Sequence, residues 1–284
     1  MSLADKIRAL EGKYAAVCGA AASPGAEVRG DAFPTGWADV DATLGRGLHR
    51  GALHEWLGLA RPIVASGKAP CSTRDGKQST RQVWSPPVGI VVHLAWQVLE
   101  TETDRASKWT VWIGRRCFPY PKVLVRAGGN DRRLLERSLF VSTRDPSDCL
   151  WSMDLALRSP AVGAVIADGH RFNMAATRRV QLLAKRFGAC ALLVRPPWER
   201  DELSAAQTRW LVQPEPRGAG RPTAPVSPRW SVKLLRCKGL PLGQGPDTWA
   251  LEWDRAKGPI GVSAPMVGQA CDPKATATSK ALVG

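Results

Sequence analysis

The sequence predicts an α/β protein with a mainly parallel sheet flanked by helices and an antiparallel, strand-rich C-terminal part. Two observations predict this class. Between residues 52 and 194, short apolar runs alternate with helix-length segments, an order typical of a parallel sheet covered on both faces. After residue 208, the strand-length runs alternate apolar and polar residues, which indicates antiparallel strands.

Three regions are predicted along the 284 residues. Residues 1–30 are expected to form a short helix and a linker, because apolar residues recur at helical spacing over 3–17 and small residues follow. Residues 31–257 are expected to form the folded core. Residues 258–284 lack apolar periodicity and are expected to be a disordered tail.

The first half of the core is predicted to contain two helices and two strands. A short helix is expected around Ala38–Leu44 and a strand over Ala52–Leu57. Residues 59–86 are rich in Pro, Gly, Ser, Thr, Lys and Arg, which predicts a long loop. Apolar residues then recur at helical spacing over Val88–Thr101, and a strand is expected over Lys108–Gly114.

The second half begins with a strand over Arg137–Ser142. Asp145 and Pro146 are typical of a helix start, with Asp as the N-cap and Pro at the first helical position. A second helix is expected to begin after Asn173 and to end at Gly188. The remaining predicted strands are 161–168, 189–194, 208–212, 229–237 and 248–254, the last two forming an antiparallel pair.

The formal net charge of +15 predicts attraction to polyanions. Residues 105–144 hold ten Lys and Arg against two acidic residues, and residues 171–200 hold seven against one. These stretches either contact DNA or an acidic partner, or they are the solvated faces of a basic protein. The candidate contact residues are Arg115, Arg116, Arg132, Arg133, Arg178 and Arg179.

Composition excludes several other classes. Seven cysteines at irregular spacing, without a CxxC pair, argue against a disulfide framework or a zinc site, and the four histidines lack metal-ligand spacing. The N-terminus does not resemble a signal peptide, and no apolar run of about 18 residues is present. A cytoplasmic, nucleoid-associated protein without a membrane partner is expected. Most of the twelve tryptophans are expected in the core.

Residues 35–58 carry a more specific pattern. Thr35-Gly36, a run of spaced glycines and a strand that ends at Gly58 resemble the segment that leads into the phosphate-binding loop of RecA-type recombinases. Trp112-Ile113-Gly114 lies where the second core strand of that family ends, and Ala164–Asp168 resembles its Walker B strand. The resemblance implies a RecA-like fold.

A narrower resemblance is to the bacterial ImuA family, over roughly residues 30–257. It rests on the order of several phrases: Leu94-Ala95-Trp96, Trp112–Arg116, Leu150–Arg158, Leu203–Ala206, Leu234–Gly239 and Trp249–Asp254. It implies an accessory role in SOS-induced translesion synthesis and DNA repair. The implied partners are RecA recombinase, an error-prone Y-family-like polymerase homologue and an error-prone replicative polymerase alpha subunit, with DNA as a further candidate.

The phosphate-binding loop itself departs from the working pattern G-x-x-x-x-G-K-[ST]. Eight residues separate Gly58 from Gly67, instead of four, and Ala69 follows Lys68 where a Ser or Thr should hold Mg²⁺. Pro62 also removes a backbone donor. A degenerate loop is therefore expected.

The catalytic acid is also replaced. The resemblance places Arg116 where RecA proteins carry the acid that polarises water, and a guanidinium cannot act as a base. Gly58, Gly67, Lys68 and Asp168 are therefore interpreted as a vestigial nucleotide site, with no enzymatic activity and no ATP or Mg²⁺ cofactor. The alternative is a divergent RecA-type ATPase that binds DNA directly and takes its phosphate contacts from loop 59–86.

Overall fold

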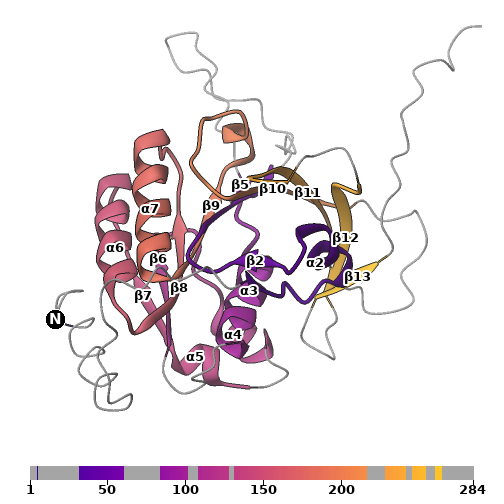
Figure 1. Cartoon of the computed structure of the whole chain (residues 1–284). Coiled ribbons are helices and arrows are strands. Elements are labelled where there is room, and N and C mark those ends of the chain that lie inside the picture. Colours follow the sequence, from indigo (N-terminus) through magenta and orange to yellow (C-terminus); the bar gives the residue numbers. More distant parts are fainter. Residues whose placement is uncertain are drawn as a thin grey trace, which may run out of the picture.

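The computed structural model describes residue 5 and residues 32–60, 84–101, 108–127, 131–215, 228–240, 245–253 and 260–263. Within these residues, nine strands form one sheet, and helices cover both of its faces in three layers (Figure 1). The predicted fold class is confirmed. Among the helices described, none is long and apolar enough to cross a membrane.

The sheet has the strand order β13-β12-β11-β10-β3-β9-β8-β6-β7. The strands from β10 to β7 are parallel, and β11, β12 and β13 extend the sheet as antiparallel neighbours. Their bounds are β3 Leu53–Leu57, β6 Trp109–Ile113, β7 Ser138–Val141, β8 Val162–Asp168, β9 Cys190–Arg195, β10 Thr208–Pro214, β11 Arg229–Cys237, β12 Thr248–Trp253 and β13 Ile260–Ser263.

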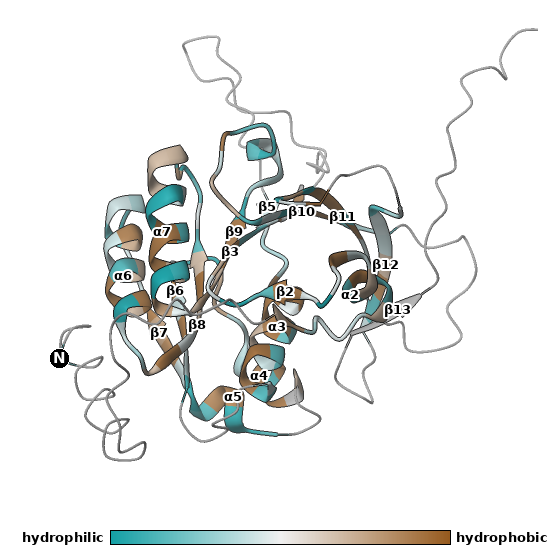
Figure 2. Cartoon of the chain, in the orientation of Figure 1, coloured by the Kyte–Doolittle hydropathy of each residue, from teal (hydrophilic) through white to brown (hydrophobic). Residues whose placement is uncertain are grey.

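Two helices cover one face of the sheet, α6 (Pro146–Arg158) and α7 (Met174–Phe187). The other face is covered by α2 (Ala38–Leu44), α3 (Val88–Glu100), α4 (Pro121–Ala127) and α5 (Arg133–Glu136). Both α6 and α7 carry hydrophobic and hydrophilic residues along their length, as amphipathic helices do (Figure 2).

The predicted helix ends of α6 and α7 are confirmed. The Asp145 carboxylate accepts a hydrogen bond from the Asp148 N–H at 2.9 Å, and the Asn173 side chain accepts one from the Ala176 N–H at 2.9 Å. Gly188 ends α7 with a φ of +72°, which a side chain would strain.

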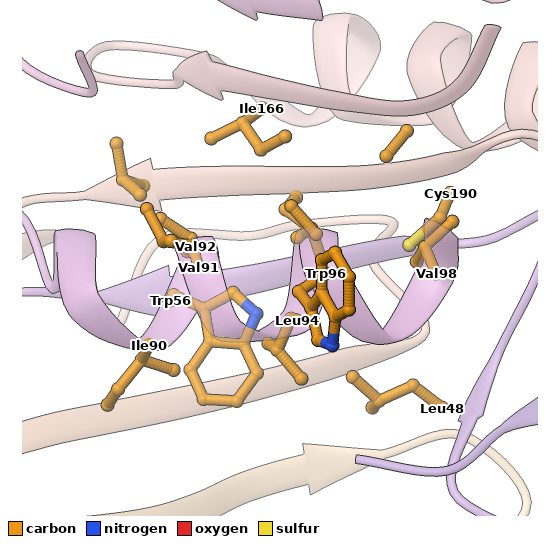
Figure 3. Close-up of a cluster of buried hydrophobic side chains, with 14 of the residues drawn as sticks. Leu48, Trp56, Ile90, Val91, Val92, Leu94, Trp96, Val98, Ile166 and Cys190 are labelled. Atoms are coloured by element: carbon orange, nitrogen blue, oxygen red, sulfur yellow. The ribbon is translucent and has the colours of Figure 1, made fainter. Parts of the chain in front are cut away.

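The larger of the two cores lies between the sheet and α3. Ile90, Val91, Leu94 and Val98 of α3 gather there with strand residues such as Trp56 and Ile166 (Figure 3). Because the two faces of the central strands each meet a core, these strands read as continuous apolar runs in the sequence.

Tryptophans dominate this core, as expected. Trp56 stacks on Trp210 with ring centroids 5.1 Å apart, and Trp37 packs edge-on against Trp56. Trp112 and Trp249 are fully buried as well. Trp151 is an exception, because it is 55% exposed on α6.

The structure corrects the sequence prediction where elements are short. The ends of the predicted loop 59–86 pair as β4 (Leu59–Ala60) and β5 (Trp84–Ser85), and β1 (Ala32–Phe33) pairs with β2 (Leu48–His49). The helices α4 and α5, of seven and four residues, were not predicted.

The ends of the chain were predicted from composition alone. The strand β13 pairs with β12 and lies inside the predicted tail 258–284, so the sheet extends past the boundary drawn at residue 257. The predicted N-terminal helix, 3–17, lies outside the described residues except for residue 5.

Candidate functional site at the carboxyl edge of the sheet

The carboxyl ends of β3, β6, β8 and β9 meet at one edge of the sheet, because these strands are parallel neighbours or share neighbours. In open α/β sheets, ligands bind in the crevice outside the carboxyl ends of the strands. Gly58, Gly114 and Asp168 lie at this edge, each at the end of its strand. It is therefore the place to test the predicted vestigial nucleotide site.

Gly58 is covered by the strand β5. Its N–H donates to the Arg195 carbonyl at 2.7 Å, and a Cβ on Gly58 would lie 2.4 Å from the Ser85 carbonyl oxygen. The same Cβ would lie 2.7 Å from a ring carbon of Trp84, which is buried. Gly58 thus admits the close approach of β5 rather than facing open space.

Asp168 is held by its neighbours through both carboxylate oxygens. The Arg116 guanidinium donates to Oδ2 at 3.0 Å, and the His170 N–H donates to Oδ1 at 3.2 Å. The Arg116 guanidinium also lies 6.0 Å from the centroid of the Trp84 ring. Arg116 therefore lies between Trp84, which packs on Gly58, and the Asp168 carboxylate at the end of β8.

Gly114 makes this arrangement possible. Its φ is +131°, and a Cβ at this position would lie 2.7 Å from the Asp168 Cβ. Only glycine permits that approach together with that backbone conformation. The turn after β6 then directs the chain so that Arg116 reaches Asp168.

This geometry is unfavourable for Mg²⁺ chemistry. A metal ion would have to displace the Arg116 guanidinium from Asp168 Oδ2, and the guanidinium itself cannot accept a proton. Within the described part of the chain, no cluster of three His, Cys, Asp or Glu side chains could hold a metal ion. Gly67 and Lys68, the other predicted members of the site, lie outside the described residues.

Two cysteines lie beside the site. The Cys149 thiol donates to the Asp168 carbonyl at 3.4 Å, and the Cys117 thiol donates to the Ile113 carbonyl at 3.1 Å. Burial raises the pKa of Cys149 to about 12 and raises the pKa of Cys117 as well. Both thiols stay protonated near neutral pH, so they are core residues and not nucleophiles.

A buried ion network next to this edge was missed by the sequence analysis. Glu55 of β3 is 0% exposed, and it pairs with Arg195 at 2.9 Å and with Arg209 at 2.7 Å. Arg195 also pairs with Glu199 at 2.8 Å. The available signal was a carboxylate in the middle of an apolar strand, which must find a charged partner when buried.

The six candidate contact arginines are not brought into one patch. Arg115 and Arg116 follow β6, whereas Arg132 and Arg133 precede β7 and so lie at the opposite edge of the parallel sheet. Arg133 pairs with Asp131 and Glu100. Arg178 and Arg179 lie on α7, where Arg179 pairs with Asp154 of α6.

The fold has a match among solved structures. The crystal structure of the RadB recombinase superposes with a TM-score of 0.52 at 12% sequence identity, covering 82% of this chain and 100% of that one. The fold is therefore RecA-like, as the sequence predicted. Together with the site, it defines the class: a RecA-like protein in which Trp84 packs on Gly58 and Arg116 pairs with Asp168 at the carboxyl edge of the sheet.

No family model matches the sequence. Two relatives do, Protein ImuA from Caulobacter vibrioides strain NA1000 / CB15N and its counterpart from strain ATCC 19089 / CIP 103742 / CB 15. Each is 31% identical over 170 residues, covering 56% of this chain and 66% of the relative. The chain belongs to the ImuA family.

Proposed function

We propose that this protein is a non-catalytic, RecA-like accessory factor in damage-induced mutagenesis, and that it acts through protein contacts. The observation that carries this proposal is the pair of contacts at the carboxyl edge, where Trp84 packs on Gly58 and Arg116 pairs with Asp168. Membership of the ImuA family and the RecA-like fold support the accessory role.

The chemistry of the site supports the proposed lack of ATPase activity. A RecA-type ATPase needs a base or water-orienting acid, a metal ligand and an open phosphate loop. Here the acid is an arginine, that arginine engages the metal ligand, and an indole covers the entry glycine. Each departure leaves a different requirement unmet, so restoring one of them would not be enough for ATP hydrolysis.

The first experiment measures nucleotide binding and turnover by the purified full chain. Titration with ATP and Mg²⁺ is expected to give no binding heat at millimolar nucleotide, and phosphate release is expected to match the buffer blank. The matched control is the Lys68→Ala, Lys77→Ala double variant. Tight, Mg²⁺-dependent binding that this variant loses would favour the alternative, a divergent ATPase using loop 59–86.

The second experiment tests the protein contacts. The proposed partners are a RecA recombinase, a Y-family-like polymerase homologue and an error-prone replicative polymerase alpha subunit. The purified chain, immobilised, is expected to retain at least one of the three purified proteins in the absence of nucleotide. Retention of none of them would contradict an accessory role exerted through these contacts.

A further inference from the structure

The loop between β9 and β10, residues 196–207, is fixed by an unusual set of charged side chains. It contains only a single 3₁₀ turn, Pro197–Glu199, and otherwise no regular structure. In Figure 1 it is the orange segment that projects from the sheet above the labels β9 and β10. Basic side chains of β10, of β11 and of the turn after β11 donate hydrogen bonds to its backbone carbonyls.

Arg209, on β10, binds the first half of the loop. Its guanidinium donates to the carbonyl oxygens of Glu199 at 3.0 Å, Arg200 at 2.9 Å and Glu202 at 2.9 Å. The same guanidinium is anchored by Glu55 at 2.7 Å. One buried side chain therefore fixes three successive parts of the loop to the central strand.

Arg236 of β11 and Lys238 of the turn after β11 bind the second half of the loop. Arg236 donates to the carbonyl oxygens of Ser204 at 2.7 Å and Ala206 at 2.9 Å, and the Lys238 ammonium donates to the Ala205 carbonyl at 2.5 Å. The Ser204 hydroxyl donates to Glu55 at 2.6 Å. The carbonyls of residues 204–206 are thus all occupied.

Glu199 connects this loop to the loop after β8. Its carboxylate accepts a hydrogen bond from the Arg171 N–H at 3.0 Å and lies 2.6 Å from His170 Nδ1. Arg171 has a φ of +65°, a conformation that side chains rarely adopt and that this contact holds in place. The two loops therefore support each other.

Burying the charged side chains that hold this loop costs free energy, because each buried charge requires a compensating partner. The same loop carries two exposed apolar side chains: Leu203 is 76% exposed and Trp198 is 38% exposed. Apolar side chains on a preorganised backbone lose little conformational entropy on binding, and tryptophan is the residue type most enriched in interface hot spots.

We propose that loop 196–207 is a protein-docking element whose Leu203 and Trp198 enter an apolar pocket rimmed by lysine or arginine side chains. The charge of the loop tip selects this occupant. Asp201 and Glu202 directly precede Leu203 and are both exposed; Arg200 pairs with Asp201 at 3.2 Å, which leaves one net negative charge over residues 200–202 on a chain whose net charge is +15. These carboxylates repel phosphate groups, so nucleic acid fits this tip poorly.

The inference rests on the proposed function in that the partner is one of the three proteins named above. The test compares the Trp198→Ser, Leu203→Ser double variant with a matched control, Trp151→Ser, Leu182→Ser, which removes one exposed Trp and one exposed Leu from α6 and α7. Affinity for each purified partner and for a single-stranded oligonucleotide is measured by biolayer interferometry.

We expect the loop variant to lose at least tenfold in affinity for one partner, with less than a twofold change for the control and for the oligonucleotide. A charge-reversed variant, Asp201→Lys, Glu202→Lys, should slow association with the same partner. If the wild type binds a partner and the loop variant binds the same partner equally well, the docking role is overturned. The proposed function would still stand in that case. Loss of oligonucleotide binding alone would also overturn it, whereas a wild type that retains no partner contradicts the proposed function itself.

Discussion

Glu55 lies in the middle of the central strand and is fully buried, yet each of its carboxylate oxygens meets a guanidinium. The two arginines come from β9 and from the start of β10, so the contacts join three neighbouring strands. A buried ion network of this kind contributes little net stability when intact, but it is expensive to break.

Replacing Glu55 by Gln leaves Arg195 and Arg209 without part of their compensating charge. We expect the free energy of unfolding to fall by about 3–5 kcal/mol, as for other buried pairs that lose one partner. Urea denaturation followed by tryptophan fluorescence measures this loss. The matched control is Glu136→Gln, in an exposed ion pair with Arg132, where a change of less than about 1 kcal/mol is expected. Equal losses for the two variants would contradict the role assigned to the buried network.

Two buried histidines predict a dependence of stability on pH. Burial lowers the pKa of His54 and of His93 from 6.5 to about 4. The unfolded chain takes up protons as the pH falls below about 6.5, whereas the folded chain does not until about pH 4. Stability is therefore complete above pH 6.5 and falls between pH 6.5 and 4, by on the order of 3 kcal/mol per histidine.

Urea denaturation at pH 7.5, 6.0 and 5.0 tests this dependence. The variant His93→Phe keeps an aromatic ring beside Trp37, on which His93 stacks with centroids 5.2 Å apart, and loses one titrating group. Its unfolding free energy should therefore fall less steeply with pH than that of the wild type. A wild type that is equally stable at pH 7.5 and 5.0 would rule out the burial of neutral histidines.

At the scale of helices, the caps predicted from sequence can be tested one at a time. Asp145→Ala removes the acceptor for the Asp148 N–H at the start of α6, and we expect a loss of about 1 kcal/mol in unfolding free energy. Ser147→Ala, at an exposed position in the same first turn, should change stability by less than about 0.5 kcal/mol. A loss no larger than that of this control would show that Asp148 finds another acceptor.

The elements that the sequence predicts well are those whose signals are local. The caps at Asp145 and Asn173, the helical spacing in α3 and the apolar runs of β8 and β9 all lie within the segment they define. Two-residue strands such as β4 and β5 carry no period, and their pairing joins residues about 25 positions apart. Their existence depends on tertiary contacts that no local pattern encodes.

The same distinction holds at the site. Gly58, Asp168 and Arg116 were identified because family resemblance fixes their positions relative to strand ends. The partners of Glu55 lie 140 and 154 residues further along the chain, and no short motif relates them. The cover over Gly58 comes from Trp84, beyond a loop whose sequence gives no indication of where it returns. The contact of Trp84 with Gly58 was therefore visible only in three dimensions.

At the scale of the whole molecule, the three candidate arginine pairs, all in the described part of the chain, lie apart rather than in one patch. The arginine pairs at 115–116, 132–133 and 178–179 lie after β6, before β7 and on α7. Arg133 and Arg179 are engaged in ion pairs with carboxylates of their own chain. Long-range attraction to a polyanion follows from the net charge, without requiring one binding groove.

We therefore expect any binding of single-stranded DNA to be weak, steeply salt-dependent and spread over the surface. Replacing any one arginine pair by glutamine should weaken binding by less than about tenfold and reduce the log–log salt slope by about 2 or less. Fluorescence anisotropy at 50–200 mM salt measures both quantities. A single pair whose loss abolishes binding would instead identify a localised DNA site.

The ion pair between Arg116 and Asp168 also bears on how this chain can change over evolutionary time. Arg116→Glu alone would set two carboxylates beside each other with no cation between them, a destabilising step. Replacing Trp84 alone would uncover Gly58 without supplying a lysine or a metal ligand. Each single change removes a contact without completing a nucleotide site, so under the proposed function no single substitution at these positions would supply ATP hydrolysis.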